Sequence, residues 1–398
     1  MIKRTTYLNR LSAFKDNEQI KVITGVRRCG KSILMQQYRD YLLSQGIAPA
    51  NIIYLNFEDF ELQQIRTEAQ LHDLLGRTLK RDVRQYLLLD EVQFVTNWQR
   101  VINGVRVSFN CDIVLTGSNA MMLSGELATL LSGRYVQIPI YPLSFDEFLT
   151  AKAIAPDTPN LDNAFNEYSQ YGGFPTVVLA AANIKDAILS GIYDSILLKD
   201  VAMRANVRDI SVLQTLVGFL ADNVGQLINP NKIANTLTSA GQKTNVHTIE
   251  RYLKLLSDAF LFYRVQQYDL RGRNYLRSTG KYFVVDNGLR RTAISQRQGN
   301  FSNQLENIVF IELKRRGYTI DIGKIDTAEI DFIARKADDI LYVQVTYELP
   351  HNNHETDNLL QIPDNYRKIV ITQRHYEFSE IAGIPIININ DWLLETPK

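Results

Sequence analysis

A short run of residues near the start of the chain has the composition and spacing of a phosphate-binding loop. Residues 25–32 follow the apolar run Ile20–Thr24, match the pattern GxxxxGK[ST] and open a stretch with helical periodicity. Glycines let main-chain N–H groups turn toward phosphate oxygens, and the start of a helix adds a favourable field. In this loop Lys31 is expected to neutralise the β- and γ-phosphates, and the Ser32 hydroxyl to ligate Mg²⁺. The residues predicted to cradle the nucleotide are Gly25, Val26, Arg27, Arg28, Cys29, Gly30, Lys31 and Ser32.

Two adjacent carboxylates follow a second apolar run. Residues 86–91 read YLLLDE, so a predicted buried strand ends in Asp90 and Glu91. Asp90 is expected to hold the water shell of the metal, and Glu91 to polarise the water that attacks the γ-phosphate. A buried strand ending in solvated acids is a common alternative. The phosphate-binding pattern upstream favours the catalytic interpretation, and with it nucleotide hydrolysis rather than storage.

Weaker candidates follow at the next two predicted strands. Thr116 and Ser118 end the run IVLTGS, where a polar side chain could sense the γ-phosphate and orient water. Ordinary turn chemistry explains the same residues equally well. Arg134 precedes the fifth predicted strand and could complete the phosphate site, from the same chain or from a neighbouring subunit. A solvated or structural arginine is the alternative, and Arg204 and Arg208 are weaker candidates for the same role.

Strands and helices alternate in the segment that would position these groups. Helical stretches are expected at Lys31–Leu43 and Leu71–Leu79, and alternation of this kind predicts a parallel sheet with right-handed crossovers. The runs at 52–57 and 86–90 are mostly apolar, which predicts strands buried on both faces. The expected strands are Ile20–Thr24, Ile52–Phe57, Tyr86–Asp90, Asp112–Thr116 and Tyr135–Ile140.

Length and composition restrict the class of protein. The chain has 398 residues, 45% of them hydrophobic, and a net charge of +1, which suits two to four globular domains and excludes a disordered chain. Two cysteines, Cys29 and Cys111, cannot build a disulfide framework. The polar, basic first ten residues do not resemble a signal peptide, and no run approaches the ~20 apolar residues of a membrane span. These features predict a cytoplasmic protein that does not enter a membrane.

The pattern becomes helical from about residue 145 to 260, and strand-like runs return after about 280. The predicted fold class is α/β. The expected organisation is a P-loop core at 1–150, a helical linker or lid at 151–210, a winged-helix-like module at 211–280 and a second α/β domain at 281–398.

The middle of the chain is basic and has a helix–turn–helix pattern. Residues 229–241 and 245–260 predict two helices, and the following strands could form a wing. Residues 204–281 contain 11 Lys and Arg against 5 Asp and Glu, a local charge of +6, so the remainder carries −5. This charge predicts contact with DNA, although winged helices also bind proteins. The residues expected to contact DNA are Thr244, Asn245, His247, Arg251, Lys254, Arg271, Arg273 and Arg277.

In combination, these motifs resemble a large family of prokaryotic AAA+-superfamily ATPases, and the resemblance covers nearly the whole chain. It implies an ATP-binding core that uses Mg²⁺, a winged-helix segment and a C-terminal domain similar to the PD-(D/E)xK nuclease fold. Many members of the superfamily form rings in which an arginine reaches across the subunit interface, which implies a homo-oligomer. The matching segments are GVRRCGKS, LLLDE, LTGSNA, SGR, YPLSFDEF, GGFP (172–175), LKD (198–200), KYFVVDNGLR (281–290) and QLENIVFIEL (304–313).

The nuclease-like site departs from the pattern that the resemblance implies. Glu306 and Asp331 match its first two acids, but the next strand, which should supply an acid and a lysine, has Gln344 and Thr346. Such a site needs converging acids for Mg²⁺ and a lysine to position water. Glu348 faces the same side of an extended strand and could compensate in part. The site is therefore expected to be degenerate.

The sequence as a whole predicts a Mg²⁺-dependent ATPase that couples hydrolysis to remodelling of DNA or movement along it. The alternative is a slow nucleotide switch that acts through protein partners. An ATP-dependent nuclease is a third, less favoured hypothesis.

Overall fold

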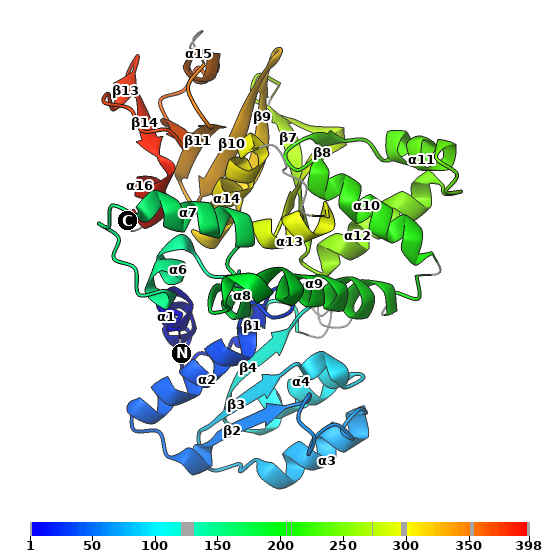
Figure 1. The fold of residues 1–398 in the computed structure, drawn as a ribbon. Helices are drawn as coiled ribbons and strands as arrows, with labels where there is room; N and C mark the ends of the chain where they lie inside the picture. Colours follow the sequence, from blue (N-terminus) through cyan, green and yellow to red (C-terminus); the bar gives the residue numbers. More distant parts are fainter. Residues whose placement is uncertain are drawn as a thin grey trace. The chain divides into compact units, whose positions relative to one another are not determined.

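The computed structural model describes residues 2–120, 131–203, 205–207, 209–272, 274–295, 301–350 and 354–395 (Figure 1). The chain forms two compact units, residues 1–140 with 258–260, and residues 141–257 with 261–398. The predicted boundary at residue 280 lies within strand β8 (Asn274–Val284). The last two predicted domains therefore share one sheet and are not separate units.

The first unit has a parallel sheet of five described strands, which confirms the predicted fold of this segment. The strand order is β2-β3-β4-β1-β5, so β4 lies between β1 and β3 and the ends of all three meet at one edge. The strands are β1 (Ile20–Thr24), β2 (Ile52–Asn56), β3 (Gln85–Asp90), β4 (Cys111–Gly117) and β5 (Tyr135–Pro139).

Alternating side chains of this sheet pack on its two faces. Leu87 and Leu89 belong to a buried cluster with the apolar sides of α3 and α4, whereas Leu88 points to the other face, as the strand period of two requires. Strand β3 is buried throughout, as predicted, but β2 is half-buried because it is the edge strand. The helices of this unit are α1 (Thr5–Ala13), α2 (Lys31–Ser44), α3 (Glu68–Thr78) and α4 (Trp98–Ser108), with 3-10 turns η1 (Pro49–Asn51) and η2 (Val92–Phe94).

The second unit begins with helices and ends with a mixed sheet. Its described strands form one sheet in the order β13-β14-β12-β11-β10-β9-β7-β8-β6. The helices before and beside it are α6 (Phe145–Ala151), α7 (Leu161–Tyr171), α8 (Pro175–Val178), α9 (Lys185–Ser195), α10 (Ile210–Asp222), α11 (Pro230–Ser239), α12 (Val246–Asp258), α13 (Asn287–Ala293), α14 (Phe301–Arg315), α15 (His354–Leu360) and α16 (Ile389–Leu394), with η4 (Ala182–Ile184) and the π-helical segment η5 (Ile196–Met203). The strands are β6 (Leu227–Ile228), β7 (Phe262–Asp269), β8 (Asn274–Val284), β9 (Thr319–Ile325), β10 (Ala328–Lys336), β11 (Asp339–Thr346), β12 (Arg367–Thr372), β13 (Glu380–Ile381) and β14 (Ile384–Asn388).

The predicted helix–turn–helix corresponds to α11 and α12, and the predicted wing to the β7–β8 hairpin. Strand β8 also pairs with β6, and β7 pairs in parallel with β9 of the C-terminal domain. Strand β9 was not predicted from the sequence. The hairpin is thus bonded along β7 into a larger sheet, which limits how freely it could move as a wing.

A buried carboxylate joins two of the sequence motifs of this unit. Asp286 caps the start of α13 by accepting hydrogen bonds from the N–H groups of Gly288 (2.8 Å) and Leu289 (3.4 Å). Its other oxygen accepts from the N–H of Gly173 at 2.7 Å. Burial raises the pKa of Asp286 to about 6 despite these hydrogen bonds. Among the described residues, no helix is both long and apolar enough to cross a membrane.

Candidate functional site

The predicted phosphate loop connects β1 to α2 in a conformation that depends on its glycines. Gly30 has a left-handed φ of +106° and occupies the cap position of α2 without a side chain to bond the first N–H groups. These N–H groups and the helix dipole together form an anion-binding terminus. At Gly25, an added Cβ would lie 2.4 Å from the carbonyl oxygen of Ile140. The backbone at both glycines therefore excludes larger residues.

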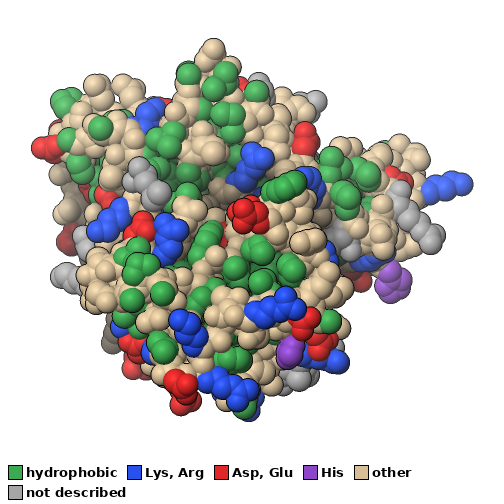
Figure 2. All heavy atoms as spheres, turned by 90° about the horizontal axis from the view of Figure 1, so that it is seen from below, with side chains coloured by type: hydrophobic (Ala, Val, Ile, Leu, Met, Phe, Trp, Pro, Cys, Tyr) green, Lys and Arg blue, Asp and Glu red, His purple; other side chains and the backbone are tan. Residues whose placement is uncertain are grey.

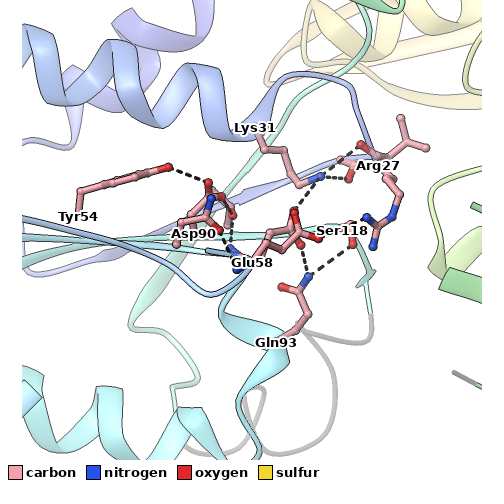
Figure 3. A network of polar contacts seen from close by, with 12 residues as sticks. Arg27, Lys31, Tyr54, Glu58, Asp90, Gln93 and Ser118 are labelled. Atoms are coloured by element: carbon pink, nitrogen blue, oxygen red, sulfur yellow. Dashed lines mark hydrogen bonds and ion pairs between the residues drawn. The ribbon is translucent and has the colours of Figure 1, made fainter. Parts of the chain in front are cut away.

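Lys31 lies over this loop, almost fully buried, on the first turn of α2. Its ammonium donates to the carbonyl oxygens of Gly25 (3.2 Å) and Val26 (3.3 Å). The same nitrogen lies 3.6 Å from Glu91 Oε1 (Figure 3). Main-chain carbonyls are neutral acceptors, so a phosphate could replace them with a stronger, charged partner.

Asp90 ends strand β3 with its carboxylate completely buried. One oxygen accepts a hydrogen bond from Thr116 on the adjacent strand β4, and the other accepts from the Tyr54 hydroxyl at 3.0 Å. Burial, together with the Asp90 carboxylate, raises the pKa of Tyr54, so this hydroxyl remains a donor. Tyr54 was not singled out in the sequence. The carboxylate is fixed in orientation by two donors from different strands.

Glu91 occupies a strained backbone position immediately after the strand. Its φ is +56°, in the left-handed region that non-glycine residues rarely adopt, and its N–H donates to Thr116 Oγ1 at 2.8 Å. Strain of this kind persists where surrounding structure enforces it, often at functional sites. Thr116 therefore bonds the carboxylate of Asp90 and the backbone of Glu91, and its role in sensing the γ-phosphate stays a prediction.

Gln93 connects the remaining members of the cluster, and sequence inspection did not identify it. Its amide nitrogen donates to Glu91 Oε2 and lies 3.5 Å from Ser118 Oγ, at the end of β4 (Figure 3). The amide oxygen of Gln93 is buried without a hydrogen-bond partner among the described residues. Gln93 follows Glu91 by two residues on a tight turn, and this short spacing is the signal that could have suggested Gln93 from the sequence.

Other residues support the loop from outside the motif. Arg4 is buried and donates to the carbonyl oxygen of Cys29 at 3.0 Å, so the residue preceding α1 holds the middle of the loop. Arg27 Nη1 lies 3.5 Å from Glu58 Oε1, on the segment that follows β2. Burial raises the pKa of the Cys29 thiol, which makes this residue a packing group and not a reactive thiolate.

Comparison with known proteins agrees with this geometry. A family model of the AAA domain matches residues 17–149, and a model of a domain of unknown function matches residues 162–300. An uncharacterized protein of Haemophilus influenzae is 59% identical over 396 residues, which is 99% of each chain. The chain belongs to this family of AAA-domain proteins.

Two further proteins are similar to this AAA-domain chain, one in sequence and one in fold. An uncharacterized protein of Methanocaldococcus jannaschii is 34% identical over 352 residues, 85% of this chain and 77% of its own. A Walker-type ATPase of Pyrococcus abyssi, of known structure, is 12% identical and superposes with a TM-score of 0.52 over 74% of this chain and 96% of its own. The latter likeness concerns the fold. The first unit is an AAA domain and shares the fold of that ATPase.

The geometry of the AAA domain rules out one predicted role for Arg134. The N–H of Ile20, at the start of β1, donates to the carbonyl oxygen of Arg134, whereas the phosphate loop begins beyond Thr24 at the other end of that strand. Five strand residues span about 16 Å, farther than an arginine side chain reaches. Arg134 therefore cannot complete the phosphate site of its own chain. Its guanidinium is exposed and lies 3.4 Å from Asn103 Oδ1.

The residues predicted to contact DNA are not equally available. Asn245 Oδ1 accepts from the N–H of Thr248 at 2.9 Å, and Arg251 donates to the carbonyl oxygen of Ala205 at 2.6 Å. Arg271 pairs with Asp326 at 2.6 Å. On α12, His247 and Lys254 are exposed, and Thr244, just before that helix, is half-buried. Arg204, Arg208 and Arg273 lie outside the described residues, as does the side chain of Arg277.

In the second unit, the two acids expected at the nuclease-like site approach each other, and Gln344 contacts the backbone of Asp331, whereas Thr346 bonds elsewhere. Glu306 and Asp331 interact electrostatically, with Lys281 of β8 beside them. Gln344 Oε1 accepts from the N–H of Asp331 at 3.3 Å, and Thr346 donates to the carbonyl oxygen of Glu348 at 2.8 Å. Lys281 was not considered in the sequence because it lies 25 residues before Glu306.

Proposed function

We propose that this AAA-domain protein binds ATP with Mg²⁺ and hydrolyses it by direct attack of water on the γ-phosphate. The observation that carries the proposal is the convergence of Lys31, Asp90 and Glu91 at one edge of the sheet. The match to the AAA domain and the fold of a Walker-type ATPase support it independently.

The side chains suit the roles that such a reaction requires. Asp90 and Ser32 offer the hard oxygen donors that would hold Mg²⁺, and the bound ion would offset charge on the phosphates. Lys31 exchanges its carbonyl partners for phosphate oxygens. Because Thr116 and Tyr54 already orient the Asp90 carboxylate, little reorganisation is needed when the nucleotide binds.

Glu91 is the general base in this proposal. Gln93 holds one of its oxygens, which fixes the carboxylate and leaves the oxygen near Lys31 to accept a proton from water. Ser118 lies on the far side of Gln93 and completes the support. Gln93 and Ser118 are therefore positioning residues.

Steady-state phosphate release with Mg²⁺ tests this assignment. Glu91→Gln is expected to bind ATP normally and to lose at least about 100-fold in turnover, since a positioned base contributes 10²–10⁴-fold. Glu61→Gln, the same change at an exposed acid of the same unit, is the matched control and should retain the wild-type rate. Wild-type turnover by Glu91→Gln would remove the residue from the mechanism.

We further propose that hydrolysis is coupled to DNA through α12 and the β7–β8 turn. The support is the excess of positive charge over 204–281 and the exposed position of His247 and Lys254 on α12. A nucleotide switch acting on proteins is the second candidate. It is favoured by the engagement of Arg251 and Arg271 within the unit, and by Figure 2, where Lys and Arg are interspersed with acidic and apolar side chains on the face drawn.

Turnover with and without DNA separates the two candidates. Single-stranded, duplex and four-way-junction DNA are each added at several salt concentrations, because phosphate contacts give a steep salt dependence. A DNA-acting motor should be stimulated, and Lys254→Glu should weaken DNA binding while Lys336→Glu, an exposed control on β10, should not. Absence of stimulation and of binding by every DNA form would favour the switch.

An oligomeric arrangement is proposed for Arg134. The guanidinium of Arg134 is remote from the phosphate site of its own chain. Because it is exposed, it could instead reach the phosphates bound to a neighbouring subunit. Arg134→Ala is then expected to bind ATP and turn over slowly, and mixing it with Lys31→Ala should restore part of the activity. No complementation in the mixture would contradict the role in trans.

A further inference from the structure

A buried lysine lies among the acids of the nuclease-like site in the second unit. Lys281, on β8, is 3% exposed. Its ammonium lies 2.7 Å from Glu329 Oε1 on β10 and 3.4 Å from Glu306 Oε1 on α14. The charge of Asp331 also acts on it. One cation is therefore surrounded by carboxylates from two elements that are distant in sequence from β8.

The groups that a divalent metal would need at this site are used elsewhere. Asp331 accepts a hydrogen bond from the N–H of Val345 at 2.8 Å. Gln344 directs its carbonyl oxygen to the N–H of Asp331, and Thr346 bonds to the backbone at the end of β11. Within the described part of the chain, no three His, Cys, Asp or Glu side chains are placed to hold a metal ion.

The remaining acid considered in the sequence does not compensate. Glu348 pairs with Arg374 at 2.9 Å, with both side chains more than half exposed. It therefore belongs to the surface and not to the buried cluster. A metal implied by the nuclease-like fold does not fit the residues of this chain.

The backbone packs closely around the acid that faces Lys281. A Cβ at Gly225, whose φ is +75°, would lie 2.4 Å from Glu306 Oε2. Burial raises the pKa of Glu306 to about 7, even though Lys281 acts in the opposite direction. Burial would lower the pKa of Lys281, but Glu306, Asp331 and Glu329 outweigh it and raise the pKa, so the lysine remains charged. Removing the ammonium would leave buried negative charge without compensation.

We propose that the ammonium of Lys281 takes the place of a divalent cation in the nuclease-like site. It is the internal counter-ion that joins β8 to α14 and β10, and the site binds no divalent metal. The second unit therefore keeps its fold without Mg²⁺. Because the position of the metal is filled by a covalently attached cation, this unit does not cleave phosphodiesters, whatever the AAA domain does.

Thermal unfolding of the nucleotide-free full chain tests the proposal with Mn²⁺ as the probe. The variant Trp98→Phe leaves Trp392, a buried residue of the second unit, as the sole tryptophan and fluorescent reporter. In this background Mn²⁺ should leave the midpoint temperature of unfolding of the second unit unchanged. Lys281→Met should lower it by roughly 10 °C, as expected for a broken buried ion pair, while Lys336→Met, an exposed lysine of the same unit, should not.

A second variant keeps the test decisive if Lys281→Met does not fold. The double variant Lys281→Met/Glu306→Gln removes both charges and should recover a large part of the lost midpoint, because the uncompensated acid is gone. Failure of the double variant to exceed Lys281→Met would overturn the counter-ion role. So would an unchanged midpoint in Lys281→Met, or a Mn²⁺-dependent rise in the parent that Glu306→Gln abolishes.

Discussion

Two buried lysines, one in each unit, lie beside carboxylates but meet different partners. Lys31 donates to two main-chain carbonyls of a glycine-bounded loop, with Glu91 at 3.6 Å. Lys281 is held by Glu329 at 2.7 Å and Glu306 at 3.4 Å. A phosphate offers Lys31 a better partner than the carbonyls, whereas Lys281 is already neutralised by charged groups. Under the two proposals, the partners of a buried lysine, more than its burial, decide whether it binds a ligand.

The largest effects are expected from substitutions of these two lysines. One substitution should remove activity, and the other should remove stability. Lys31→Ala should reduce phosphate release at least about 100-fold, because a charged group at the transferred phosphoryl is lost. It should cost the first unit less stability than Lys281→Met costs the second, since the nearer partners of Lys31 are neutral carbonyls and Glu91 lies 3.6 Å away. Lys281→Met should destabilise the second unit and leave phosphate release nearly unchanged.

Trp98 and Trp392 lie in different units, so a variant that keeps only one of them reports the unfolding of one unit within the full chain. Urea unfolding followed at Trp98 reports the effect of Lys31→Ala, and at Trp392 that of Lys281→Met. Lys80→Ala, an exposed lysine of the first unit, is the control for activity. A Lys281→Met variant that lost turnover but kept the stability of the second unit would contradict the distinction between the two lysines.

The second prediction uses the raised pKa values of Asp286 and Glu306. A carboxyl whose pKa is higher in the folded than in the unfolded state stabilises the fold at low pH and loses that contribution as the pH rises through the folded value. Asp286, raised from 3.8 to about 6, contributes on the order of 3 kcal/mol that disappears between pH 4 and pH 6. Glu306, at about 7, extends the fall toward neutral pH.

Urea unfolding at Trp392 from pH 4 to pH 7.5 measures this slope. Asp286→Asn is expected to flatten it below pH 6, although the variant will be less stable because an amide cannot accept from Gly173 and Gly288 with both atoms. Glu167, whose pKa is lowered by Lys152 and Lys185 despite its burial, acts with the opposite sign and at lower pH. An Asp286→Asn variant with the parent slope would show that this carboxyl is ionised throughout.

The sequence predicted the first unit better than the second, for physical reasons. Buried parallel strands are largely apolar, so β1, β3 and β4 and the residues at their ends were visible as patterns. The half-buried edge strand β2 was misjudged because the sequence does not reveal strand order. Strand β9 reads TIDIGKI, whose polar residues conceal a buried strand.

Apart from Gln93, which is close to Glu91 in the sequence, the parts of the two sites that escaped prediction depend on tertiary contacts. Lys281 and Glu306 meet because β8 and α14 pack together, and no spacing in the chain encodes this. Arg4 and Tyr54 support the loop and Asp90 from elements that carry no motif. Arg134 was wrongly considered for the site of its own chain because strand direction, and not sequence distance, determines which end of the sheet it occupies.

The third prediction concerns Gln93, whose amide nitrogen donates to the carboxylate of Glu91. Gln93→Leu should lower kcat about tenfold with KM unchanged, because the base loses its orientation while the phosphate contacts remain. Gln99→Leu, at a half-buried glutamine on α4 of the same unit, is the control. A rise in KM with normal kcat would mean that Gln93 contacts the substrate instead of the base.

The smallest expected effect sharpens the account of the first unit. Tyr54→Phe removes one of the two donors to Asp90 and leaves Thr116 in place. Because outer-shell donors orient metal-binding carboxylates, the Mg²⁺ concentration for half-maximal turnover should rise several-fold, with kcat at saturating Mg²⁺ nearly unchanged. Tyr41→Phe, on α2, is the control.

Thr116→Val should have a larger effect than Tyr54→Phe, since Thr116 bonds both Asp90 and the backbone of Glu91. Equal effects would mean that the link to Glu91 contributes nothing to turnover.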